Sequence, residues 1–227
     1  MIILGKIRTF INKVDTIIYR KEKVVLNDYY INRFQGEDKA QLFYAVSSGK
    51  DIVVQELLKK GVEPNFSDNT GATPLSLAVN YKHFNIADML IEHGALIDYS
   101  SDNWLTSYTA LSFACHSENI DGVAYLIKKG ADLNLSSKLC GTPLTAAIES
   151  NSVYIVKELL EAGADPNRKK ISSGYQTEKN VPICIAAMAG HKEIVDILVA
   201  YNAKTKPLRK IPRHEILSRM VRYLKKK

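Results

Sequence analysis

Cysteine is scarce in this chain, with three cysteines among 227 residues. Cys115, Cys140 and Cys184 stand far apart, and none has a CxxC partner or a nearby pair of histidines at ligand spacing. This argues against a disulfide framework and against a zinc site, and it indicates reduced thiols in a cytoplasmic compartment. We therefore expect no metal and no cofactor.

Long apolar runs are also missing. No stretch approaches the ~18–20 apolar residues of a membrane span, and Lys6, Arg8 and Lys13 interrupt the apolar run that a secretory signal needs. Twelve glycines and seven prolines exclude collagen-like and proline-rich linker sequences. With 46% apolar and 24% charged residues, the composition is typical of a soluble globular protein. We expect a monomer without a membrane span, in the cytoplasm of its own cell or of a host cell.

Positive charge is concentrated at one end of the chain. The formal net charge is +7, but residues 204–227 hold ten lysines and arginines against one acidic residue. Residues 39–203 hold 14 basic against 18 acidic residues. The basic character is thus a property of the tail, and nucleic acid is not the expected partner of the body of the chain.

A repeat organises the middle of the chain. Each of five copies opens with an aliphatic residue, has an alanine three residues later, and ends 19 residues later at a glycine or, in the last copy, an asparagine. The opening residues are Leu42, Leu75, Leu111, Leu144 and Ile183. The spacing between copies is 33, 36, 33 and 39 residues. A constant internal offset with variable spacing indicates rigid units joined by loops of changing length.

Each copy is expected to form two short helices. Thr73-Pro74-Leu75 and Thr142-Pro143-Leu144 place an N-cap threonine before a proline at the first helical position. The turn residues between the helices are Gly49, Lys82, Glu118, Asn151 and Gly190. Glycine and asparagine suit a left-handed helix end better than lysine or glutamate do. Because two-turn helices are unstable alone, the copies are expected to stack as an all-α solenoid.

The copies resemble ankyrin repeats over roughly residues 39–206. The motifs that carry the resemblance are Gly71-Ala72-Thr73-Pro74-Leu75, Gly163-Ala164-Asp165-Pro166-Asn167 and Gly190-His191-Lys192-Glu193-Ile194-Val195. The histidine that follows the opening leucine in this family is replaced in every copy, so its capping interaction is expected to be altered or missing. The replacements are Phe43, Ser76, Ser112, Thr145 and Cys184. The resemblance implies an ankyrin-repeat solenoid whose partners bind a concave surface formed by the first helices and the loop tips.

Both ends of the chain are expected to form helical caps on the solenoid. In residues 1–38, apolar residues recur at helical spacing; a membrane-surface or partner-binding amphipathic helix is the alternative. In residues 207–227, Ile211-Pro212 and the apolar stripe that ends at Leu224 resemble the opening helix of an F-box. Only three residues follow Leu224, and a complete F-box needs further helices, so a basic capping helix is the preferred interpretation.

No catalytic set is present in the sequence. The histidines fall at different repeat positions, and there is no Walker loop, no dinucleotide-binding glycine turn and no histidine pair on a helix. Asp132 and Asp165 are expected to bond backbone N–H groups in turns. His191 belongs to the repeat motif, and Cys115 and Cys184 are expected to be buried. We predict that the protein is not an enzyme.

Candidate binding residues lie on the first helices and in two long spacers. The spacer at 99–107 holds the only tryptophan, and the spacer at 168–180 holds Arg168-Lys169-Lys170 and a tyrosine. Aromatic residues and arginine dominate interface energies. The predicted partner-binding residues are Tyr81, Trp104, Tyr108, His116, Ser117, Glu149, Tyr175 and Met188.

The predicted function is binding of another protein, such as a toxin, a host factor or an enzyme, as an inhibitor, adaptor or effector. Two alternatives stay open. The first is a ubiquitin-ligase adaptor that acts through the F-box-like helix. The second is a binder of nucleic acid or anionic surfaces that uses the basic tail and the cluster at 168–170.

Overall fold

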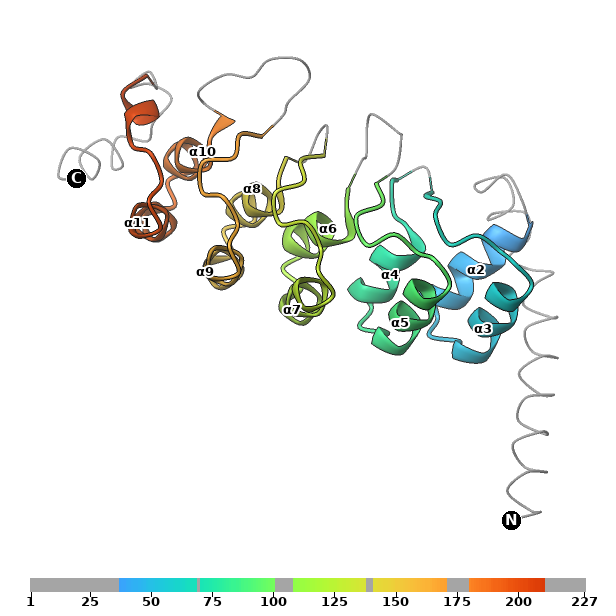
Figure 1. The fold of residues 1–227 in the computed structure, drawn as a ribbon. Coiled ribbons are helices and arrows are strands. Elements are labelled where there is room, and N and C mark those ends of the chain that lie inside the picture. Colours follow the sequence, from blue (N-terminus) through green and yellow to red (C-terminus); the bar gives the residue numbers. More distant parts are fainter. Residues whose placement is uncertain (1–36, 69, 101–107, 138–140, 171–179, 211–227) are drawn as a thin grey trace, which may run out of the picture.

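The computed structural model is a row of five helix pairs stacked in chain order (Figure 1). It describes residues 37–68, 70–100, 108–137, 141–170 and 180–210, so the predicted caps within 1–36 and 211–227 lie outside the described residues. The first helices are α2 (Glu37–Ser47), α4 (Pro74–Asn80), α6 (Ala110–His116), α8 (Pro143–Glu149) and α10 (Pro182–Ala189). The second helices are α3 (Asp51–Lys59), α5 (Phe84–Glu92), α7 (Ile120–Lys128), α9 (Val153–Glu161) and α11 (Lys192–Ala200), and a short 3-10 helix, η2 (Lys206–Lys210), follows them. The prediction of an all-α solenoid is confirmed.

Three of the first helices, α4, α6 and α8, begin at threonine caps, whereas Val181 before α10 makes no side-chain cap bond. The Oγ1 atoms of Thr73, Thr109 and Thr142 accept from the backbone N–H three residues later, at 3.0, 3.1 and 3.2 Å. In copy two, the Ser76 Oγ returns the bond by accepting from the Thr73 N–H at 2.8 Å. The capping interaction that the family histidine would make is therefore altered here rather than missing, because the replacing serine completes a capping box.

Every predicted turn residue adopts a left-handed backbone. The φ angles are +65° at Gly49, +60° at Lys82, +54° at Glu118, +56° at Asn151 and +80° at Gly190. Lysine and glutamate thus take a conformation that side chains with a Cβ rarely adopt. The reversal between two packed helices imposes this conformation, and the packing outweighs the local preference of the residue.

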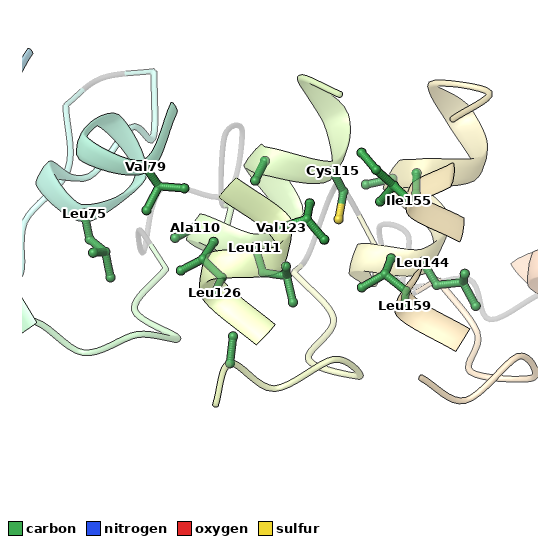
Figure 2. Close-up of a cluster of buried hydrophobic side chains, with 14 of the residues drawn as sticks. Leu75, Val79, Ala110, Leu111, Cys115, Val123, Leu126, Leu144, Ile155 and Leu159 are labelled. Carbon is green, nitrogen blue, oxygen red and sulfur yellow. The ribbon is translucent and has the colours of Figure 1, made fainter. Parts of the chain in front are cut away.

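The core runs without interruption along the whole described array. Figure 2 shows its centre, where Leu111 and Cys115 of α6 lie among side chains of the neighbouring helices. Leu144 is 1% exposed and Leu126 is fully buried. The opening aliphatic residue and the alanine three residues later face this core in every copy, as the repeat predicts.

A ladder of side-chain to backbone hydrogen bonds ties each copy to the next. The side-chain oxygens of Asn65, Asp98, Asn134 and Asn167 accept from the backbone N–H groups of Leu96, Asp132, Asp165 and Lys204 at 2.8 to 3.0 Å. Each acceptor stands four residues after the glycine that ends its copy. The copies are therefore fixed in relative position by polar bonds outside the core as well as by apolar packing.

Candidate functional site

The candidate site is a line of equivalent positions along the first helices, which we call the first-helix face. It comprises the third residue before the opening aliphatic residue of each copy and the fifth and sixth residues after it. In the five copies these residues are Lys39, Ser47, Ser48, Ala72, Asn80, Tyr81, Tyr108, His116, Ser117, Gly141, Glu149, Ser150, Asn180, Met188 and Ala189. Because stacked copies place equivalent positions in line, the face crosses all five copies.

The structure places six of the eight predicted binding residues. Tyr81, His116, Ser117 and Glu149 are exposed, whereas Tyr108 and Met188 are half-buried. Met188 packs partly against the core, so it offers less surface than the sequence analysis assumed. The other two, Trp104 and Tyr175, lie outside the described residues.

An aromatic cluster lies on copy three. The ring of Tyr108 approaches the ring of His116, with 5.8 Å between centroids. It also meets Phe113 of α6 edge-on at 5.8 Å, an arrangement that favours the ring quadrupoles. Tyr108 and His116 were both predicted as binding residues from the sequence, but Phe113 was not. The signal for Phe113 was its place one helical turn before His116, on the same side of the helix.

Tyr81 forms a second aromatic element at the end of α4. Its side chain is 53% exposed and stacks against His83, with 6.2 Å between centroids and 26° between planes. His83 in turn covers Gly49 of the preceding copy, where an added Cβ would come within 2.8 Å of the imidazole Cε1. His83 was given no role from the sequence, but it stands at the Gly-His position of the repeat, as His191 does, so the expectation that the histidines fall at different repeat positions is wrong for this pair.

A partly buried ion pair lies on copy four. The Lys170 Nζ is 2.6 Å from the Glu149 Oε1, and the aliphatic part of Lys170 covers Gly141, where an added Cβ would meet the lysine Cγ at 2.6 Å. The backbone N–H of Lys170 donates to the Asn180 carbonyl at 2.8 Å. Lys170 was expected to contribute to an exposed basic cluster, but in the structure its charge is paired with a carboxylate of α8.

The reactive groups of the interior are isolated from solvent. Cys115 and Cys184 are buried, as predicted, and burial raises the pKa of the Cys115 thiol far above its usual range. Burial also lowers the pKa of His191.

Asp132 and Asp165 accept from the backbone N–H groups two residues later at 2.8 Å, which confirms their expected role in turns. No group of three or more metal-ligating side chains occurs in the described part of the chain.

The opposite side of the array carries fixed charge. On α5 and α7, Asp88 accepts from the Tyr125 hydroxyl at 2.7 Å and pairs with the Lys129 Nζ at 2.6 Å. These bonds lower the pKa of Asp88. This cluster joins copies two and three on the side of the second helices, where Glu92 and Lys128 are also exposed.

None of the helices within the described ranges has the length and apolar character needed to cross a membrane.

Comparison with known proteins gives a consistent result. A family model described as ankyrin repeats (3 copies) matches residues 20–103, 42–137 and 96–170. The chain is 33% identical over 153 residues to the ankyrin repeat protein FPV031 of Fowlpox virus (strain NVSL), which covers 66% of this chain and 43% of the viral protein. It is 26% identical over 187 residues to the ankyrin repeat protein L371 of Acanthamoeba polyphaga mimivirus, covering 82% of this chain and 23% of that protein. It is also 29% identical over 142 residues to Rabankyrin-5 of Mus musculus, covering 60% of this chain and 12% of that protein. The chain thus spans less than half the length of each of these relatives.

Proposed function

The chain belongs to the ankyrin repeat family, whose repeats generally mediate protein–protein interaction without catalysis, and we propose that it binds a partner protein through the first-helix face. The mechanism is steric. A surface held rigid by stacked helices docks the partner and either blocks it or recruits it, so that the protein acts as an inhibitor, adaptor or effector.

The exposed aromatic surface of copies two and three is the observation that carries this proposal. Tyr81 is 53% exposed at the C-cap of α4, whose residues 74–79 are buried, and Tyr108 and His116 form a cluster on copy three. Aromatic side chains have few rotatable bonds, so they lose little entropy on docking while burying a large area. Residues of this kind typically contribute ~2 kcal/mol or more each at an interface.

Affinity capture with the full chain as bait, followed by binding measurements on the captured partner, tests the proposal. Tyr81→Ala and Trp104→Ala are each expected to weaken binding by at least ~30-fold, because a loss of ~2 kcal/mol corresponds to a ~30-fold change in affinity. Glu92→Ala and Lys128→Ala, on the opposite side, are the matched controls and should change the affinity little. Binding that responds to the controls and not to the aromatic variants would place the partner on the second helices.

The melting temperature of the same variants separates lost contacts from lost structure. An exposed aromatic residue should cost less than about 1 kcal/mol of stability when it is replaced. If Trp104→Ala destabilises the protein as strongly as a core substitution, Trp104 is a packing residue and contributes nothing direct to the interface.

A second candidate function is the binding of a ligand with phosphate groups by the basic tail, because residues 204–227 hold ten lysines and arginines. We propose that residues 207–227 cap the array and that residues 1–38 do the same at the other end. Deletion of Lys225–Lys227 should then leave the fold and the main partner unaffected. Loss of binding after this deletion, together with strong salt dependence, would favour a ligand with phosphate groups.

A further inference from the structure

We infer that Asn65 is an N-glycosylation acceptor whose modification breaks the joint between copies one and two, so that the complete array forms only where this asparagine stays unmodified. Asn134, at the same repeat position of copy three, is a second site of this kind. The inference concerns the stacking of the copies, and it holds whichever face binds the partner.

The acceptor motif occurs at two asparagines of the chain. Asn65-Phe66-Ser67 and Asn134-Leu135-Ser136 each have the form Asn-x-Ser. In a chain that enters the secretory pathway, this motif accepts an oligosaccharide and is typical of a surface loop. Here both asparagines belong to the hydrogen-bond ladder between copies, in which Asn134 accepts from the Asp165 N–H at 2.8 Å. The motif therefore lies on a structural joint.

The side-chain amide of Asn65 holds copy two at two points. Its Oδ1 accepts from the Leu96 N–H at 2.8 Å, and its Nδ2 donates to the Gly94 carbonyl at 2.8 Å. Both partners lie on one backbone segment, on either side of Ala95, which is buried. The amide hydrogen that reaches Gly94 is therefore the one on the same side of the C–N bond as Oδ1.

Glycosylation replaces this hydrogen. The transfer forms a bond between Nδ2 and the C1 atom of the sugar, breaks the bond between C1 and the lipid pyrophosphate of the donor, and releases one proton from Nδ2. The product is a secondary amide, which is planar and trans, so the sugar lies on the same side of the C–N bond as Oδ1. The sugar thus takes the place of the hydrogen that bonds to Gly94, and its bulk meets the backbone at Ala95. Both bonds of the joint are lost.

The other copies avoid this modification in two ways. Copy two has the serine, at Ser100, but carries Asp98 in place of the asparagine. Asp98 still accepts from the Asp132 N–H at 3.0 Å, so a carboxylate keeps the acceptor half of the joint. Copy four keeps Asn167, but Lys169 stands where the motif needs serine or threonine.

Directing the full chain into the endoplasmic reticulum of a eukaryotic host with a secretory signal tests this inference. A tag that contains one further acceptor motif reports that the transfer machinery has acted, and peptide mapping by mass spectrometry identifies the modified asparagines. Chain that is glycosylated at Asn65 is expected to melt about 4–8 °C below the same chain made in a bacterial cytosol. This is the shift that the loss of two hydrogen bonds gives in a chain of this size.

Serine variants separate the two sites and supply the matched control. Ser67→Ala and Ser136→Ala remove the motif but keep each asparagine and its ladder bonds. Ser136→Ala leaves only Asn65 open to transfer, so it should show the fall in melting temperature. The double variant from the same compartment carries the tag glycan alone and should melt as its bacterial form does. Recovery of the double variant but not of the wild type is the same result in a stronger form.

Asn65→Asp tests the joint without a glycan. This variant, made in a bacterial cytosol, keeps the acceptor oxygen and loses the donor N–H, so it should melt about 2–4 °C below the wild type. An unchanged melting temperature would show that the donor bond to Gly94 contributes nothing, and would overturn the inference.

Two further results would also overturn it. One is glycosylation of Asn65 with an unchanged or higher melting temperature. The other is an Asn65 that stays unmodified in the endoplasmic reticulum while the tag is glycosylated. Neither result affects the proposed function, which is tested separately by partner binding of the bacterial protein.

Discussion

Leu144→Ala should divide the array into two weakly coupled parts. Leu144 is 1% exposed and lies in the first turn of α8, in the fourth of the five copies (Figure 2). At ~0.8 kcal/mol for each buried carbon that is removed, the transfer contribution is about 2.4 kcal/mol. The cavity left between α6 and its neighbours raises the expected loss to about 3–5 kcal/mol. This is a large fraction of the ~5–15 kcal/mol that stabilises a typical folded protein.

The consequence for cooperativity follows from the linear architecture. Each copy contacts only its neighbours, so a weakened fourth copy lowers the coupling between copies one to three and copy five more than it lowers the stability of either side. Equilibrium unfolding in urea, followed by far-UV circular dichroism, should therefore show a lower midpoint and a shallower or biphasic transition, because the slope reports the surface exposed in one cooperative step.

Leu96→Ala is the matched control for Leu144→Ala. Leu96 is 62% exposed, so the same substitution there should change the free energy of unfolding by no more than ~0.5 kcal/mol. An unchanged midpoint and slope for Leu144→Ala would refute the assignment of Leu144 to the central core. Equal effects at both leucines would refute the argument from burial.

Three further outcomes are expected. Asn119→Ala should lower the free energy of unfolding by about 1–2 kcal/mol in urea titration, because the Asn119 side chain caps the Gly122 N–H at 3.0 Å and donates to the Val79 carbonyl of the preceding copy at 2.9 Å; unchanged stability would contradict the bridging role. Glu158→Gln should stabilise the protein at pH 7, because burial raises the pKa of the Glu158 carboxyl. The folded state then holds the Glu158 proton more tightly than the unfolded state does, so the wild type should lose stability as the pH rises above ~4.3. The difference in stability between wild type and variant should vanish below that pH. A variant that is less stable than the wild type at pH 7 would contradict this sign. Cys115 should resist a thiol-alkylating reagent at neutral pH until the protein unfolds, since burial raises its pKa, and rapid labelling of the folded protein, mapped by mass spectrometry, would show that the site opens.

Local rules account for the part of the fold that was predictable. Thr73 caps a helix because its hydroxyl reaches a backbone N–H three residues away in any sequence context. The repeat spacing fixed the positions of the left-handed turns, even at Lys82 and Glu118, where residue preference alone would have placed them elsewhere. These features involve residues within about one helical turn of one another, or they recur identically in several copies.

The candidate site was less predictable because its contacts depend on the directions of individual side chains. Position in the repeat sufficed to place Tyr81, His116 and Glu149 on the exposed side of their helices. It could not show that Tyr81 stacks on His83 or that Phe113 supports Tyr108, because side-chain direction decides those contacts.

The sequence by itself determined that five similar helix pairs would stack and where each helix would begin and turn, since an amphipathic pattern repeated in register leaves one way to bury its apolar side. Only the tertiary structure decided which charges remain on the first-helix face. Lys170 lies 21 residues from Glu149 in a spacer that breaks the repeat, and its side chain passes over Gly141 to pair with the carboxylate. A contact between a repeat and an insertion follows no periodic rule, so it becomes visible only when the chain is folded.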